Sequence, residues 1–269
     1  MTGAVYQVRL ASGATVIAKH GPVTAEVAGL RWLADTVRVP EVLGADDEWL
    51  VLARVEEGEP TPRAAEEFGR QLAAMHAAGA AAFGQAPPGG PVDAWIGMAP
   101  MVNVPAASWP EWYAEYRVAP YLRRCADAGT LRAAEVAVVE QVIERLPDLA
   151  GPPEPPARLH GDLWQGNVLW SADGHVRLID PAAHGGHRET DLAMLALFGC
   201  PLADRVLAAY QEVAPLADGW AGRIPLHQLF PLLVHTELFG RGYAGRTVAA
   251  ARQALADPGG AFAQDAPTV

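Results

Sequence analysis

The residues best suited to chemistry lie in one short run, HGDLWQGN, at positions 160–167. This run contains Asp162 and Asn167 in the spacing D-x-x-x-x-N, and an apolar stretch, VRLI, delivers Asp180 thirteen residues after Asn167. In phosphoryl transfer, one aspartate accepts the proton of the attacking hydroxyl, while an asparagine and a second aspartate hold magnesium against the phosphates. The three side chains therefore have the types and the order that phosphoryl transfer requires.

The second position of the run distinguishes two classes of acceptor. Protein kinases use H-R-D-x-x-x-x-N followed by an aspartate. Here Gly161 stands where that motif has its arginine. Losing this arginine removes the cation that would read a phosphate on an activation loop. The pattern thus points away from protein substrates.

A single lysine is the next feature. Of the 20 Lys and Arg residues, only Lys19 is a lysine, and its compact ammonium suits phosphate sites that do not accept a planar guanidinium. Lys19 ends a predicted strand, and Glu26, in the first turn of the helix predicted next, is placed to pair with it. The alternative is a surface ion pair beside a solvated loop, because each feature alone is weak. Together, Lys19, Glu26, the D-x-x-x-x-N run and Asp180 follow the order of a nucleotide-phosphate site.

Two groups of elements must position these residues. The first is rich in strands, and an acidic stretch, EEGEPTP, follows it and predicts a lobe boundary. Its elements are strands at 5–10, 15–19 and 48–55 and a helix at 23–34.

The second group is mostly helical. Phe68, Leu72 and Met75 have the spacing of a buried helix stripe, and 84–105 reads as a Pro/Gly-rich loop. Two further stripes are interpreted as core, namely the aromatic residues of 109–116 and the set Leu131, Val138, Val142 and Leu146. The remaining predictions are short strands at 167–170 and 175–180 and helices near 201–214, 223–240 and 246–256. Pro231 should kink the second of these helices or shift its start.

Composition excludes several classes of protein. The chain has 269 residues, of which 51% are hydrophobic, and its net charge of −11 opposes non-specific binding of nucleic acid. No run of 18 apolar residues occurs, and the N-terminus lacks a secretory pattern, so no membrane partner is expected. Two cysteines are too few for a disulfide framework. We expect a cytoplasmic enzyme with a small-molecule partner; the sequence does not determine its oligomeric state.

Five segments carry a resemblance to a known family. They are HGDLWQGNVLW, IDPAAHGGHRETDLAM, DAWIG followed by Asn103, WPEWYAEYRVAPYLRR and LHQLFPLLVHTELFGRGYAGR. The chain resembles the fructosamine (ketosamine) kinases, relatives of the aminoglycoside phosphotransferases within the protein-kinase-like superfamily, from about residue 4 to residue 255. The resemblance implies an α+β, two-lobed fold. It has a small β-rich nucleotide-binding lobe at 1–56, a larger helical lobe with the catalytic loop and acceptor site at 57–256, and a flexible tail at 257–269.

The resemblance also implies a role for each site residue. Asp162 would be the catalytic base, Asn167 and Asp180 would bind Mg2+, and Lys19, braced by Glu26, would bind the phosphates of ATP. The hinge that binds adenine would be Leu52, Ala53, Arg54 and Val55. Trp164 would flank the acceptor, and Asp191 would anchor the catalytic loop. The implied reaction moves the γ-phosphoryl group of ATP to a hydroxyl of an amine-linked ketose.

Two departures from the family pattern bear on this reading. Almost nothing precedes Val5, so only Thr2, Gly3 and Ala4 remain to cover the phosphates, where the family has a further strand and a glycine-containing loop. We therefore expect a nucleotide-binding lobe truncated at its start, which would weaken nucleotide binding. After Asp180 the chain has HGG at 184–186, where the family often has a Tyr-Tyr-Gly-like stretch.

Three alternatives stay open on the sequence. A metal hydrolase would use the ligands His160, Asp162, Asp180, His184 and His187. A catalytically degenerate protein would bind nucleotide without turnover. A related phosphotransferase would act on an aminoglycoside, a choline-like amine or another hydroxylated metabolite.

Overall fold

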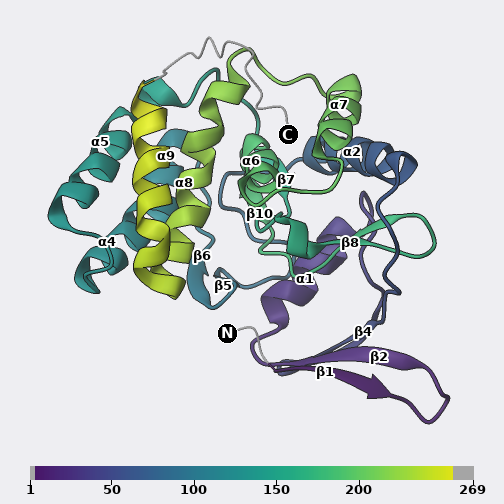
Figure 1. The fold of residues 1–269 in the computed structure, drawn as a ribbon. Coiled ribbons are helices and arrows are strands. Elements are labelled where there is room, and N and C mark those ends of the chain that lie inside the picture. The colour runs from purple at the N-terminus through teal and green to yellow at the C-terminus, as the bar shows by residue number, and fades with distance from the viewer. Residues whose placement is uncertain (1–3, 257–269) are drawn as a thin grey trace. The chain divides into compact units, whose positions relative to one another are not determined.

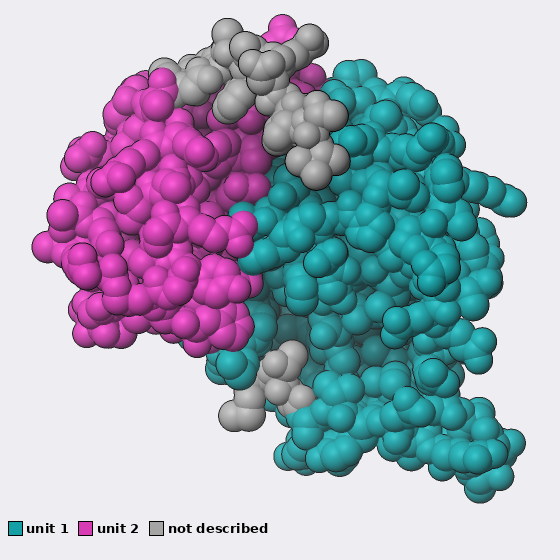
Figure 2. Space-filling view, viewed as in Figure 1, with its two compact units in different colours: residues 1–112, 155–215 teal, residues 113–154, 216–269 magenta. Residues whose placement is uncertain are grey.

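The computed structural model describes residues 4–256 of the chain. These residues form parts of two compact units, each built from two separate segments (Figure 2). The first unit comprises Met1–Trp112 and Pro155–Pro215, and the second comprises Tyr113–Glu154 and Leu216–Val269. All the predicted site residues belong to the first unit.

The first unit begins with an antiparallel four-stranded sheet of order β1-β2-β4-β3 (Figure 1). Helix α1 covers one face of this sheet, where Val27 and Leu30 pack against Leu50 and Leu52. In the ladder Lys19 lies opposite Leu50, and cross-strand partners share a face of a sheet. The register therefore turns Lys19 towards α1. The bounds are β1 (Ala4–Arg9), β2 (Thr15–His20), α1 (Thr24–Leu33), β3 (Val42–Ala45) and β4 (Trp49–Ala53).

The longest helix of this unit is α2 (Pro62–Ala77). Its N-terminus is capped by the Thr61 side chain, which accepts a hydrogen bond from Ala64 N at 3.2 Å, and Pro62 occupies the first turn, where no N–H is needed. Helix α7 (Ala203–Val213) lies beside it (Figure 1). The contact is close at Gly69, because a Cβ there would stand 2.2 Å from the carbonyl oxygen of Val206.

The segment that contains the HGDLWQGN run follows as short elements in the same unit. They are strand β7 (Ala157–Leu159), the 3-10 turn η2 (Gln165–Asn167), strands β8 (Val168–Trp170), β9 (Val176–Leu178) and β10 (His184–Gly186), and helix α6 (Glu189–Leu197). Strands β8 and β9 form a hairpin, and β7 pairs with β10. The unit also contains the hairpin of β5 (Asp93–Ile96) and β6 (Ala99–Val102), and the short helix α3 (Trp109–Trp112).

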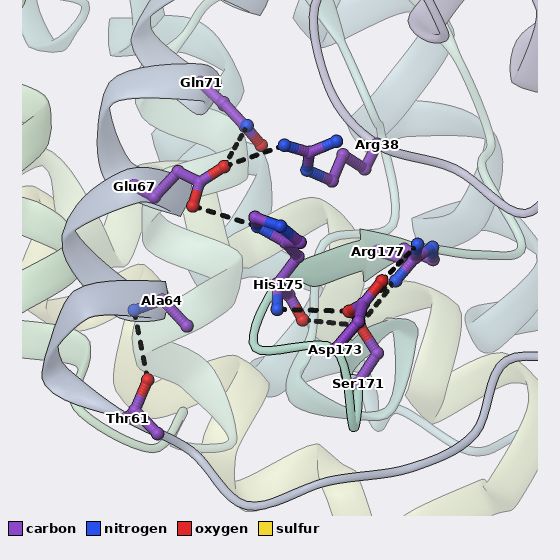
Figure 3. Close-up of polar contacts among 9 residues, drawn as sticks. All are labelled: Arg38, Thr61, Ala64, Glu67, Gln71, Ser171, Asp173, His175 and Arg177. Carbon is purple, nitrogen blue, oxygen red and sulfur yellow. Dashed lines mark hydrogen bonds and ion pairs between the residues drawn. The ribbon is translucent and has the colours of Figure 1, made fainter.

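The β8–β9 hairpin is attached to α2 through polar side chains (Figure 3). Glu67 of α2 contacts His175 Nδ1 at 3.0 Å and the guanidinium of Arg38 at 3.1 Å. At the turn of the hairpin, Arg177 pairs with Asp173 at 2.7 Å. Because Asn167 directly precedes β8 and Asp180 closely follows β9, the pairing of the two strands, with Val168 opposite Leu178, places the two residues at the same end of the hairpin.

The second unit is helical, and α8 packs against both α9 and α4. Its long helix α8 contains Pro231, which has no N–H to bond the carbonyl of His227. The hydroxyl of Tyr113 lies at this point: it donates to Leu226 O at 2.9 Å and to His227 O at 3.4 Å, and it accepts from Phe230 N at 3.1 Å. The helix therefore continues through the proline. The bounds are η1 (Tyr113–Val118), α4 (Ala119–Asp127), α5 (Ala133–Leu149), α8 (Trp220–Phe239), η3 (Gly240–Tyr243) and α9 (Ala244–Ala256).

Several predictions about individual elements were wrong. The loop predicted at 84–105 contains the β5–β6 hairpin, and β3 and α6 were not foreseen. In α5 Val139 is buried, and Val138 is only partly buried. The helix predicted near 223–240 is confirmed as α8, and Pro231 does not shift its start. Pro/Gly-rich hairpins and helices buried on all sides lack the periodicities on which sequence reasoning depends. The predicted tail at 257–269 lies outside the described residues, and the lobe boundary at 56/57 stays a prediction within the first unit.

A membrane-crossing segment is not found among residues 4–256, since each helix there is too short or too polar.

Candidate active site

Lys19 lies between two carboxylates. Its Nζ is 2.5 Å from Glu26 Oε1 and also contacts Asp180 Oδ1, although 161 residues separate it from Asp180 in the chain. The lysine is 6% exposed. Burial lowers the Lys19 pKa, but the charges of Glu26 and then Asp180 outweigh burial, so the pKa is raised overall and the ammonium stays charged. For Glu26, burial is the main cause of a raised pKa.

Asp162 and Asn167 are joined directly. The Asn167 amide nitrogen donates to Asp162 O at 2.8 Å and to Asp162 Oδ2 at 3.1 Å, so the amide oxygen faces away and is left available. Backbone pairing of Ile179 N with Asn167 O at 3.1 Å brings the next residue, Asp180, to the same place. Asp180 itself has φ +52°, a left-handed conformation in which aspartate is enriched. The structure thus brings the two aspartates and the asparagine together beside Lys19.

The electrostatics of this cluster favour a cation. Burial, more than the neighbouring charges of Asp180 and Asp191, raises the pKa of Asp162 to about 7. The hydrogen bond from Asn167 opposes that rise. The Lys19 ammonium is shared by Glu26 and Asp180, and Asp162 adds a further carboxyl group close to Asp180. The available donors are oxygen atoms, which Mg2+ prefers. The side chains present fit a divalent ion of that kind.

His160 connects the two halves of the site. Its Nδ1 accepts from Asp162 N at 3.2 Å, so its Nε2 carries the hydrogen and donates to Ile179 O at 2.9 Å. Burial lowers the His160 pKa, which keeps the imidazole neutral. This role was not foreseen: the sequence analysis considered His160 only as a possible zinc ligand. His184 also bonds a backbone carbonyl, but through Nδ1: its partner is Ala182 O at 2.8 Å.

Asp191 holds the backbone of the HGDLWQGN run, the anchoring role that the resemblance implies for it. Its two oxygens accept from His160 N at 2.8 Å and from Gly161 N at 2.9 Å. Gly161 has φ +83°, and a Cβ on it would stand 2.2 Å from Ala182 O. Only glycine satisfies both conditions, which explains the residue that replaces the arginine of protein kinases.

Trp164 stands on the exposed side of the loop. Its indole is 37% exposed and meets the Phe198 ring edge to face, with centroids 6.1 Å apart and an interplanar angle of 73°. Gly166 lies beneath this indole, because a Cβ there would approach the ring to 2.3 Å. Phe198 was not foreseen as part of the site. It follows α6 without any spacing signal.

The predicted hinge divides into two parts. Leu52 and Ala53 are strand residues, and Ala53 N donates to Glu41 O at 2.9 Å. Beyond the hinge, Ala172 N donates to Glu56 O at 2.8 Å and ties the chain to the β8–β9 hairpin. Between these ties, Arg54 and Val55 have no backbone hydrogen bond to another described residue. A hollow of about 410 Å³ is lined by residues 53–56 together with parts of the β8–β9 hairpin, and Lys19, Asp162, Asn167 and Asp180 are not among its lining residues.

Comparison with known proteins identifies the family of this chain. The sequence profile of the family described as fructosamine kinase matches residues 17–257. The chain belongs to the fructosamine kinase family. It is also similar to a candidate ketoamine kinase of Thermus thermophilus, with 35% identity over 222 residues that cover 82% of this chain and 78% of the relative.

Proteins of known structure share the fold of this chain, both within the fructosamine kinases and among other phosphotransferases. A candidate fructosamine-3-kinase from Thermobifida fusca aligns with a TM-score of 0.88 and 55% identity over 93% of this chain and 89% of that one. A macrolide 2′-phosphotransferase (TM-score 0.61, 18% identity, 94% and 87% covered) and an aminoglycoside phosphotransferase (0.56, 14%, 94% and 94%) share the fold. As a member of this family, the chain is an ATP-dependent phosphotransferase with the α+β, kinase-like fold predicted for it.

Proposed function

We propose that this fructosamine kinase phosphorylates a hydroxyl of an amine-linked ketose with Asp162 as general base. The observation that carries the proposal is the cluster in which Lys19, Asp180, Asn167 and Asp162 meet. In the transfer, the sugar hydroxyl oxygen forms a bond to the γ-phosphorus of ATP as the bond to the bridging oxygen breaks. The hydroxyl proton passes to Asp162, and ADP leaves.

The environment of Asp162 suits a base. Its pKa of about 7 lies close to physiological pH, where a general base is both ionised and strong enough to accept a proton. Asn167 bonds Asp162 Oδ2, which leaves Oδ1 to face a substrate. Asp191, through the loop backbone, holds the whole residue in place.

Asp180 and the amide oxygen of Asn167 would hold Mg2+. When bound, the ion neutralises charge on the phosphates. The chain's own contribution is the pairing of Lys19 with Glu26, which keeps the ammonium extended towards Asp180 so that it can bind the α- and β-phosphates. For adenine, the backbone groups of Arg54 and Val55 are the better donors and acceptors, since those of Leu52 and Ala53 belong to the sheet.

Trp164 would bind the acceptor. A ketosamine carries a positively charged secondary amine, and an exposed indole face attracts such a cation. The name of the Thermobifida protein refers to position 3 of the sugar, and we propose the hydroxyl at C3 as the acceptor here. With Trp164→Ala, the KM for the ketosamine should rise about tenfold while the KM for ATP stays the same.

A cytoplasmic location is part of the proposal. It depends on composition: the two cysteines, Cys125 and Cys200, are both free thiols.

The test is a panel of acceptors in an ADP-release assay with ATP and Mg2+. It compares fructosyl-lysine, ribulosyl-lysine, an aminoglycoside, choline and no acceptor, and the phosphorylated carbon is located by NMR. We expect turnover with the two ketosamines. Turnover with the aminoglycoside or choline alone would assign a different substrate class. Nucleotide binding without turnover on any acceptor would indicate a degenerate kinase.

A further inference from the structure

A buried chain of hydrogen bonds lies behind the catalytic loop and plays no part in the chemistry described so far. It begins at the hydroxyl of Tyr210 on α7, which contacts His76 Nδ1 on α2 at 2.9 Å. It continues from His76 Nε2 to Asp191 Oδ2 on α6 at 3.2 Å. The three residues are 0%, 3% and 1% exposed, so water does not compete for these bonds.

The direction of the bond between His76 and Asp191 follows from the chemistry of the groups. Burial alone would raise the Asp191 pKa, but the bond from His76 and the backbone N–H groups lower it overall, so the carboxylate is ionised and only accepts. His76 therefore carries its hydrogen on Nε2. Its Nδ1 is then left to pair with the Tyr210 hydroxyl, which can donate or accept.

Asp191 is the only link between this chain of bonds and the catalytic loop that the described hydrogen bonds provide. Its Oδ1 bonds Gly161 N, and its Oδ2 is shared between His160 N and His76 Nε2. The two loop amides already satisfy the hydrogen-bonding needs of the carboxylate. The third bond comes from the His76 ring, which lies between α2 and α7, and it also fixes the rotation of the carboxylate about the Cα–Cβ axis. Rotation of this carboxylate would move Gly161 N, and Asp162 is the next residue.

We propose that His76 and Tyr210 are positioning residues for the phosphoryl transfer: they orient Asp191, and through its bonds to the loop backbone they set the position of Asp162. The inference rests on the proposed role of Asp162 as base. A displacement of a reacting group by about 1 Å can cost on the order of 100-fold in rate. The pair therefore affects kcat without contacting ATP or the acceptor.

The test uses variants that remove one bond at a time in the full-length protein. Tyr210→Phe removes only the hydroxyl, His76→Ala breaks both bonds, and His76→Gln restores a donor to Asp191. With ATP, Mg2+ and fructosyl-lysine or ribulosyl-lysine, we expect kcat to fall about tenfold in Tyr210→Phe and about 100-fold in His76→Ala. His76→Gln should recover much of that loss. The KM for ATP should stay within about twofold.

Tyr113→Phe is the matched control. Tyr113 is also a buried tyrosine with a bonded hydroxyl, but its partners are the backbone of α8 and not the catalytic loop. It should lower the melting temperature at least as much as Tyr210→Phe while kcat stays at the wild-type value. Equal kcat in Tyr210→Phe and wild type, well below both melting temperatures, would overturn the inference.

Hydrogen exchange separates failure of this inference from failure of the proposed function. The amides of His160 and Gly161 should exchange faster in Tyr210→Phe and His76→Ala than in wild type, whatever the substrate. If Asp162→Asn turns over normally, Asp162 is not the base, yet faster exchange still supports the link from Tyr210 to the loop. If Asp162→Asn is inactive while exchange and kcat are unchanged in Tyr210→Phe and His76→Ala, only the positioning role is refuted.

Discussion

Replacement of Asp162 by Asn should have two opposite effects, a loss of turnover and a gain in stability. The loss arises because the amide cannot accept the hydroxyl proton, and a general base contributes roughly 10²- to 10⁴-fold. The gain arises because the ionised carboxylate is held in a site that disfavours its charge. Asn keeps the shape of the protonated acid and can still accept the hydrogen bond from Asn167.

The size of the gain follows from the pKa. The Asp162 carboxyl rises from its ordinary 3.8 to about 7 on folding, and each pKa unit corresponds to about 1.4 kcal/mol. The folded state binds the proton more tightly, so the stabilisation by the protonated acid is complete below pH 3.8 and is lost as pH rises through 7. At pH 8 the ionised wild type should therefore be less stable than Asp162→Asn by about 2–4 kcal/mol. This corresponds to a melting temperature about 5–10 °C higher for the variant.

Calorimetric scans of the ligand-free protein at pH 4 and pH 8 provide the measurement. The two melting temperatures should converge at pH 4, and at pH 8 added Mg2+ should reduce the gap because a bound cation offsets the carboxylate charge. Asp173→Asn is the control. Asp173 is an exposed carboxylate whose pKa is lowered, chiefly by Arg177, so its neutralisation should decrease stability slightly and leave kcat unchanged. An Asp162→Asn protein that melts below wild type at pH 8, or that retains wild-type kcat, would refute the reasoning.

The remaining predictions concern other bonds of the structure. Lys19→Arg should reduce kcat/KM on the order of 100-fold despite the conserved charge, because a planar guanidinium does not replace an ammonium held between Glu26 and Asp180; wild-type kinetics would contradict this. Tyr113→Phe should cost about 1–3 kcal/mol in urea unfolding, since it leaves buried backbone groups of α8 unpaired. Gly161→Ala should abolish activity, because the added Cβ would clash with Ala182 O; an active variant would show that the loop can adopt another conformation. The free-enzyme profile of kcat/KM should rise with pH and level off above about 7, as Asp162 ionises; a flat profile between pH 5 and 8 would argue against Asp162 as the base.

Local patterns predicted much of the first unit. The strands at 4–9 and 15–20 and the helix at 24–33 were predicted within one or two residues, because alternation and a three-four spacing are properties of neighbouring residues. The β5–β6 hairpin and α6 were missed for the same reason. The hairpin lies in a Pro/Gly-rich segment, and α6 is buried on nearly all sides, so neither carries a periodic signal.

By itself the sequence determined which chemical groups this protein contains and in what order they occur: Lys19, Glu26, the HGDLWQGN run and Asp180. These are covalent facts, and the chemistry of phosphoryl transfer restricts them to few readings. Only the tertiary structure decided that Lys19 meets Asp180 across 161 residues, that the pKa of Asp162 is raised, and that His76 and Tyr210 lie behind the loop. Contact between distant segments and the removal of water around a charge are products of packing, and no local spacing of residues encodes them.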